Sequence, residues 1–111
     1  MQYYINGKFV SSSKANIPFN DSGFLYGDGL FETMRFDGKN IFSYEKHIKR
    51  LFQVLSIINL EISETKESLL SLLNKVIHIN NLESGIIRLM ITRGDSNKMS
   101  PAFNIPCVYI S

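Results

Sequence analysis

Hydrophobic and polar residues alternate in two stretches of the chain, each interrupted by a glycine turn. Residues 3–10 alternate around Asn6-Gly7, a strong signal for a tight turn between two antiparallel strands. Residues 30–36 and 41–42 lie on either side of Asp37-Gly38, which has the same turn chemistry. The pattern therefore predicts two hairpins, one at the N-terminus and one in the first half of the chain.

Apolar residues then recur at helical spacing in two segments. The first segment follows Ser43, a candidate N-cap, and we expect its helix to run to about Ile58. Its apolar positions, at i, i+3, i+4 and i+7, are Ile48, Leu51, Phe52 and Leu55. The second segment follows the cap candidates Ser63 and Thr65 and ends at Asn80-Asn81. Its stripe consists of Leu69, Leu72, Leu73 and Val76.

Two more apolar runs complete the pattern. Residues 86–92 predict a buried strand and residues 106–110 another, whereas the polar residues 11–21 predict a loop. The fold class is therefore α+β, a mostly antiparallel sheet with two helices, in a single domain formed by residues 1–111. The first helix also carries Val54, Ile57 and Ile58 roughly opposite its core stripe, so we expect a second surface to cover them.

Composition narrows the class of protein. Of the 111 residues, 44% are hydrophobic and 20% charged, which is typical of one globular domain, and the net charge of +2 comes from charges spread along the chain. No block of Lys or Arg indicates a nucleic acid or membrane partner. A single cysteine, Cys107, excludes an intrachain disulfide, and no signal peptide is recognisable, so we expect a cytoplasmic protein.

The run from Asp21 to Thr33 has the character of a site. Gly27 and Gly29 flank Asp28, which allows the backbone to turn sharply and another group to approach it closely. A strand is expected to start directly after this turn. A lone Gly-Asp-Gly would be an ordinary loop, so the interpretation depends on the other motifs.

Four motifs occur in a characteristic order. They are Tyr3-Tyr4-Ile5-Asn6-Gly7-Lys8-Phe9-Val10, then Phe24-Leu25-Tyr26-Gly27-Asp28-Gly29-Leu30-Phe31-Glu32-Thr33-Met34-Arg35, then His47-Ile48-Lys49-Arg50-Leu51, and finally Ile87-Arg88-Leu89-Met90-Ile91-Thr92-Arg93-Gly94. Together they resemble the N-terminal domain of the class IV aminotransferases. These fold-type IV enzymes use pyridoxal 5′-phosphate and include aminodeoxychorismate lyase and the D-amino acid and branched-chain aminotransferases. The resemblance covers nearly the whole chain.

The resemblance also implies what is missing. In the family the Schiff-base lysine and the acid against the pyridine nitrogen lie on a C-terminal catalytic domain, and no segment of this sequence matches it. None of the lysines is assigned to the Schiff base, so we expect this chain alone to be inactive. The chain stops inside an apolar strand, at Ser111, and we expect it to be truncated.

Cofactor binding is assigned to Arg50, which matches the family's phosphate-binding arginine. A guanidinium suits this task because its rigid fork of donors pairs two phosphate oxygens and stays charged. Without the motif, Arg50 would be interpreted as a surface arginine. Tyr26 and Phe31 match aromatic residues of the substrate pocket, although two core aromatics would explain them equally well.

Two arginines are candidates for the substrate carboxylate. Arg88 matches an arginine of the branched-chain enzymes, and Arg93 matches one that can face a carboxylate in the D-amino acid aminotransferases and the lyases. Residues five apart on one strand point to opposite faces unless the strand bulges, so at least one of the two is expected to be structural. The resemblance assigns no catalytic residue to this chain, and we predict no metal ligand.

Function follows from the branch that the motifs resemble. Ile86 stands where branched-chain enzymes carry tyrosine, and the segments around Tyr26 and Phe31 resemble the lyases most. We therefore expect the N-terminal part of an aminodeoxychorismate lyase that acts as a homodimer on a carboxylate-bearing amine. The alternative is a D-amino acid or branched-chain aminotransferase. A noncatalytic dimerising module is the alternative of another class, which a stop codon after Ser111 would support.

Overall fold

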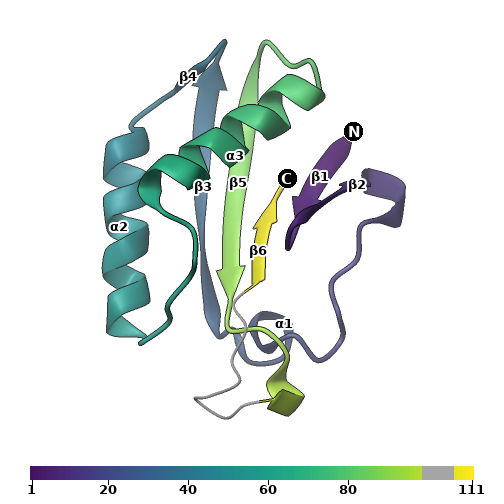
Figure 1. Cartoon of the computed structure of the whole chain (residues 1–111), viewed down its shortest axis with the longest axis vertical. Helices are drawn as coiled ribbons and strands as arrows, with labels where there is room; N and C mark the ends of the chain where they lie inside the picture. The colour runs from purple at the N-terminus through teal and green to yellow at the C-terminus, as the bar shows by residue number, and fades with distance from the viewer. Residues whose placement is uncertain (99–106) are drawn as a thin grey trace.

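The computed structural model describes residues 1–98 and 107–111 of the chain (Figure 1). Two long helices cover one face of a six-stranded sheet, and a one-turn helix lies at the lower end of the view in Figure 1. The elements are β1 (Gln2–Ile5), β2 (Lys8–Ser11), α1 (Ser22–Tyr26), β3 (Gly29–Asp37), β4 (Asn40–Ile41), α2 (Tyr44–Ile57), α3 (Lys66–Ile79), β5 (Ser84–Thr92) and β6 (Cys107–Ile110), with 3-10 turns at Ser12–Lys14 and Ser96–Lys98.

The strands are arranged in the order β2-β1-β6-β5-β3-β4, and each described pair is antiparallel. This confirms the predicted α+β class. The last strand, β6, pairs with both β1 and β5, so it closes the middle of the sheet. Pro106, which the pattern placed at the start of this strand, lies outside the described residues.

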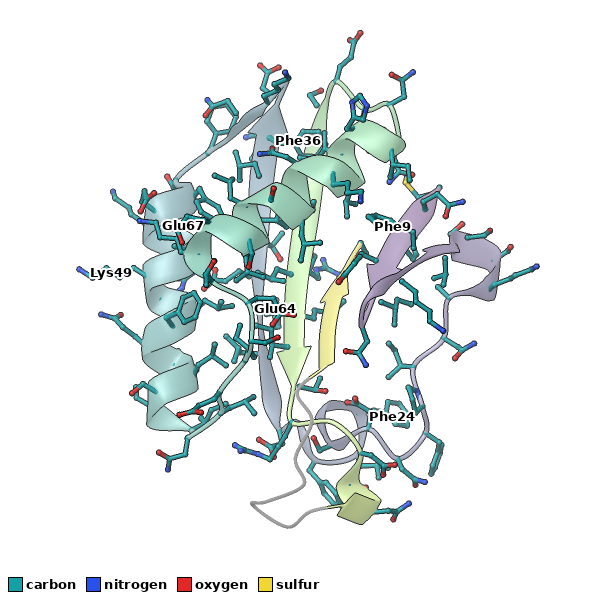
Figure 2. The ribbon with its side chains drawn as sticks, in the orientation of Figure 1. Phe9, Phe24, Phe36, Lys49, Glu64 and Glu67 are labelled. Carbon is teal, nitrogen blue, oxygen red and sulfur yellow. The ribbon has the colours of Figure 1, made fainter. Side chains whose placement is uncertain are left out.

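Helices α2 and α3 lie on the same face of the sheet, and the core lies between them and the strands (Figure 1). Figure 2 shows Phe36 of β3 beneath α3, whereas Lys49 of α2 points away from the sheet. The other buried side chains that strands β3 to β5 contribute to this core are Met34, Ile41, Ile87, Leu89 and Ile91.

The opposite face of the sheet is covered by neither α2 nor α3, and among the described helices only the short α1 lies against one end of this face. Phe31, Thr33 and Arg35 of β3 point to it and are exposed, as is Ile86 of β5. The prediction of a fully buried strand at residues 86–92 is therefore wrong for one face. Its nearly continuous apolar sequence suggested burial on both sides, but only alternate residues of β5 are covered here.

The turns and caps mostly follow their sequence signals. Asn6 and Gly7 both have positive φ in the first hairpin, and Thr65 caps α3 in a reciprocal capping box with Ser68. Ser43 precedes α2 as predicted, but it has φ 56° and its side chain makes no cap hydrogen bond. The first turn of α2 is instead tied to α3, because the Tyr44 hydroxyl donates to the Lys66 carbonyl at 2.6 Å.

Candidate cofactor and substrate site

The glycine-rich segment forms α1 and the turn that leads into β3. Asp21 begins the helix: its Oδ1 accepts from the backbone N–H of Gly23 at 2.8 Å and its Oδ2 from the Thr92 hydroxyl at 2.8 Å. Gly27 ends the helix in the left-handed conformation, with φ 65°. A Cβ on Gly29 would lie 2.6 Å from the Ile91 carbonyl oxygen, so only glycine fits there. Gly27 therefore allows the sharp turn and Gly29 the close approach that the sequence indicated.

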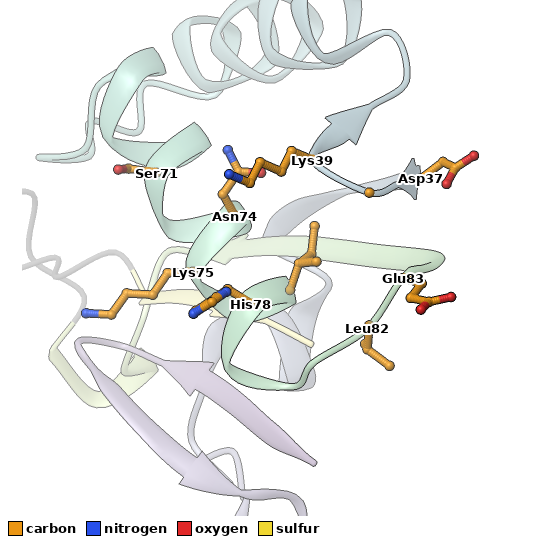
Figure 3. A pocket seen from close by; sticks show the side chains of 10 residues that line it. Asp37, Lys39, Ser71, Asn74, Lys75, His78, Leu82 and Glu83 are labelled. Carbon is orange, nitrogen blue, oxygen red and sulfur yellow. The ribbon is translucent and has the colours of Figure 1, made fainter.

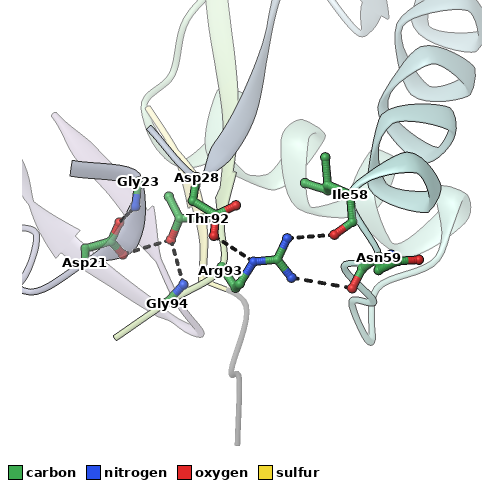
Figure 4. A network of polar contacts seen from close by, with 8 residues as sticks. All are labelled: Asp21, Gly23, Asp28, Ile58, Asn59, Thr92, Arg93 and Gly94. Carbon is green, nitrogen blue, oxygen red and sulfur yellow. Dashed lines mark hydrogen bonds and ion pairs between the residues drawn. The ribbon is translucent and has the colours of Figure 1, made fainter. Parts of the chain in front are cut away.

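Arg93 connects this turn to the end of α2 (Figure 4). Its Nε donates to Asp28 Oδ2 at 2.7 Å, its Nη2 donates to the Ile58 carbonyl at 2.7 Å, and its Nη1 donates to the Asn59 carbonyl at 3.5 Å. The side chain is 16% exposed. Both edges of the guanidinium are thus engaged within the chain.

A second polar cluster lies between β3 and α2. The Glu32 carboxylate accepts from Arg50 Nε and Nη2, both at 2.6 Å, and its Oε2 lies 2.7 Å from His47 Nδ1. Glu32 belongs to the helix-facing side of β3, and its side chain is only 5% exposed. A buried carboxylate requires such partners, because an unpaired buried charge is strongly unfavourable.

The contact between Glu32 and Arg50 stabilises the charged forms of both side chains. The hydrogen bond from Arg50 is the main reason that the pKa of Glu32 is lowered, followed by burial, which opposes it, and by the hydrogen bond with His47. The same bond to Glu32 raises the pKa of the Arg50 guanidinium. Glu32 is therefore a carboxylate and Arg50 a cation at neutral pH. The Arg50 side chain is 64% exposed, so part of its guanidinium faces outward.

The remaining predicted residues lie on or near the open face of the sheet. Phe31 pairs with Met90 and Thr33 with Arg88, which makes Phe31 and Arg88 diagonal neighbours on adjacent strands. Phe31 is 65% exposed, and Tyr26, at the end of α1, is 69% exposed, so neither is a core aromatic. Arg88 is exposed, and among the described side chains its guanidinium makes one long contact, of 3.4 Å from its Nε to the Thr33 hydroxyl.

Phe31 also lines an open hollow next to α1. This hollow has a volume of about 430 Å³, and Ile17, Phe24, Leu30 and Met90 form part of its mostly apolar wall. Gly27 and Gly29 also line it. The structure thus brings Phe31 and Arg88 onto one face and leaves Arg50 on the other side of β3.

A larger hollow of about 890 Å³ lies elsewhere, between α3 and the β3–β4 turn (Figure 3). Figure 3 shows Lys39, Lys75 and His78 around it, with Asp37 and Glu83 toward one end. None of the predicted site residues lines it. We therefore keep the candidate site at β3, β5 and α2.

Sequence reasoning missed the acids that organise these clusters. Glu32 was seen only as part of a motif, although it alternates with the core residues Met34 and Phe36 and thus stands where an apolar side chain is expected. An acid on the core side of a strand, facing a helix that carries His47 and Arg50 at i, i+3, is a signal that could have revealed it.

Two kinds of feature are absent from the described residues. Among the described residues no group of three or more His, Cys, Asp or Glu side chains could hold a metal ion. No helix in that part of the chain has the length and apolar character required to cross a membrane.

Comparison with known proteins identifies the family. Residues 29–111 match the family model described as amino-transferase class IV. A Methanocaldococcus jannaschii protein that carries the name of a branched-chain-amino-acid aminotransferase is 40% identical over 95 residues, which are 85% of this chain and 33% of that protein. D-alanine aminotransferase of Listeria innocua is 35% identical over 97 residues, which are 87% of this chain and 34% of that protein.

The fold is also similar to that of a solved aminotransferase structure. The branched-chain amino acid aminotransferase of Escherichia coli superimposes with a TM-score of 0.88 at 27% identity, over 99% of this chain and 38% of that one. The chain thus spans about a third of the length of the curated relatives that it matches. On this evidence, the chain belongs to the class IV aminotransferase family.

Proposed function

We propose that these 111 residues form the N-terminal domain of a pyridoxal 5′-phosphate-dependent amino acid aminotransferase. The observation that carries the proposal is Arg50, which matches the family's phosphate-binding arginine and holds an outward-facing guanidinium against a buried carboxylate. The relatives reported above are named as aminotransferases, which favours this alternative over the lyase that the motifs led us to expect.

The donor set of Arg50 fits a phosphate group. Glu32 occupies Nε and one hydrogen of Nη2, and a guanidinium has five N–H donors in total. Three donors that Glu32 does not use remain for a ligand, in a planar fork that matches phosphate oxygens. When bound, the cofactor would supply the electron-withdrawing ring that transamination requires, and Arg50 would hold its phosphate end.

Arg88 is our candidate for the substrate carboxylate, with Phe31 and Tyr26 as apolar walls. Arg88 is exposed beside Phe31 on the open face, so its guanidinium can pair with a carboxylate while the aromatic ring contacts an apolar side chain. The unpaired edge of β3 supports a single site to which residues on both faces of the sheet contribute. β4 pairs only with Phe36 and Asp37, so among the described strands none covers that edge along Gly29–Met34, between the two faces.

Arg93 is assigned a structural role instead of substrate binding. Its guanidinium is largely buried and donates to Asp28 and to the Ile58 carbonyl, which leaves little of its fork for a ligand. This agrees with the expectation that Arg88 and Arg93 would not both face one substrate. Holding Asp28 in place also fixes the turn between Tyr26 and Phe31.

An assay of the full-length gene product tests the proposed reaction. The protein is supplied with pyridoxal 5′-phosphate and tested with D-alanine, with branched-chain L-amino acids and with aminodeoxychorismate. Transfer of the amino group from an amino acid to a 2-oxo acid is the expected result. Cleavage of aminodeoxychorismate without amino transfer would support the lyase, and no turnover of any substrate, with no cofactor bound, would support the noncatalytic module.

The 111 residues alone are expected to be inactive, because the lysine that carries the cofactor in the family has no matching position among them. Borohydride reduction with pyridoxal 5′-phosphate followed by peptide mapping tests this, and one stoichiometrically labelled lysine would contradict it.

We also propose a homodimer, supported by Ile57 of α2, which is 77% exposed, and by the exposed Phe24. Sedimentation over a range of concentrations measures the association.

A further inference from the structure

We propose that Glu32 is a positioning residue for phosphate recognition. Its buried carboxylate, held by His47, fixes the guanidinium of Arg50 in one orientation, with its remaining donors available to the cofactor phosphate. This inference rests on the proposed function, since it assumes that Arg50 binds the phosphate. It adds a residue that does not itself touch the cofactor.

The geometry supports a clamp. Two parallel hydrogen bonds of 2.6 Å join the carboxylate to Nε and Nη2 of Arg50, which is the side-on arrangement that restricts rotation of a guanidinium most. Oε2 is shared with His47 Nδ1 at 2.7 Å, so the carboxylate is itself held at two points. Glu32 lies on a nine-residue strand and both its partners lie on α2, three residues apart, which makes the supports rigid.

The need for a clamp follows from the exposure of Arg50. A side chain that is 64% exposed would otherwise sample many rotamers, and binding a ligand would cost the entropy of ordering it. Glu32 is almost fully buried and ordered in the fold, so that cost is met when the domain folds. Pre-organisation of this kind increases affinity without a new contact to the ligand.

A purely electrostatic argument predicts the opposite effect of Glu32 on phosphate binding. A carboxylate beside Arg50 repels a phosphate dianion, so its removal would strengthen binding if Glu32 only offset the charge of Arg50. The two explanations can therefore be separated by the direction of one measured effect.

The test compares affinities of the full-length gene product, freed of cofactor, for pyridoxal 5′-phosphate and for pyridoxal, which lacks the phosphate. Glu32→Gln keeps the size of the side chain and should lower the preference for the phosphorylated form about 2- to 12-fold, the range set by immobilising one long side chain. Glu32→Asp keeps the charge but shortens the reach, and should also lower the preference. General misfolding would lower both affinities together and leave their ratio unchanged.

Glu45→Gln is the matched control. Glu45 also lies on α2 and also pairs with a cation, Lys66, but it is exposed and, five residues before Arg50, points to a different side of the helix. Its substitution should leave the ratio unchanged. In spectra of protein labelled with ¹⁵N-arginine, the Nε–H signal of Arg50, assigned by its loss in Arg50→Lys, should be protected from exchange in the parent and lost in Glu32→Gln.

An unchanged or increased preference in a Glu32→Gln variant that folds would overturn the clamp. If that variant does not fold, Glu32→Asp and the parent spectrum decide, and an unprotected Arg50 Nε–H signal in the parent also overturns it. Arg50→Ala distinguishes this failure from failure of the proposed function. If Arg50→Ala loses the preference while Glu32→Gln keeps it, only the clamp is wrong, whereas if both keep it, Arg50 does not bind the phosphate.

Discussion

Replacing Arg93 by alanine should destabilise the fold, which would distinguish a structural arginine from a substrate-binding one. The substitution removes two hydrogen bonds of 2.7 Å, one to the Asp28 carboxylate and one to the Ile58 carbonyl, from a side chain that is 16% exposed. Hydrogen bonds to charged groups contribute about 1.5–3 kcal/mol each, but neighbouring bonds are not additive. We discount the sum because the Asp28 side chain is 27% exposed, and expect a loss of roughly 2–4 kcal/mol.

Urea denaturation followed by circular dichroism measures this loss as a change in the free energy of unfolding. Arg88→Ala is the control, because Arg88 is exposed and its guanidinium makes one long contact, of 3.4 Å, with the described side chains, so its loss should change that free energy by less than about 0.5 kcal/mol. Arg93→Lys should recover only part of the loss, since an ammonium lacks the fork that reaches both partners. An Arg93→Ala variant as stable as the parent but with a raised KM for the amino acid would refute the reasoning.

Three other predictions concern stability. Gly29→Ala should cost about 1–3 kcal/mol in the free energy of unfolding, because the new Cβ would lie 2.6 Å from the Ile91 carbonyl oxygen, and urea denaturation would show an error if the variant matched the parent. Burial raises the pKa of Tyr44 from 10.0 to about 12, so the folded state holds its proton more tightly than the unfolded state does. The stabilisation is complete below pH 10 and is lost as the pH rises to about 12, and Tyr44→Phe should abolish this part of the alkaline loss. The pKa of Glu32 is lowered from 4.5, chiefly by Arg50, so its stabilisation is present above pH 4.5 and is lost at lower pH. Acid titrations should therefore show a shallower loss in Glu32→Gln, and an equally steep loss would count against the ionised pair.

Much of the sheet and both long helices could be predicted from the sequence because the signals are local. Asn6-Gly7 and the alternation around it specify a hairpin, and the leucine stripe after Thr65 specifies α3. The one-turn helix α1 was missed because five residues are too few for a periodic pattern. It depends instead on the Asp21 side chain, which accepts from Thr92 far along the chain.

The order of strands and the polar clusters could not be predicted. The apolar pattern of the last strand predicted the strand but not its neighbours, and long-range pairing places β6 between β1 and β5. Likewise, Arg50 and Arg93 were assigned from motifs, whereas their different surroundings result from Glu32 and Asp28, which are distant in sequence. Local pattern identifies which residues are unusual, and tertiary contacts decide what each one does.

The preference of the full-length gene product for pyridoxal 5′-phosphate over pyridoxal, compared between the parent and Arg50→Ala, tests the central claim most directly. Loss of a charge-assisted phosphate contact should cost on the order of 1.5–3 kcal/mol, which is roughly ten- to more than a hundredfold in affinity. The account predicts that the preference falls by this factor while affinity for pyridoxal is unchanged. An Arg50→Ala variant with the parent's preference would contradict it.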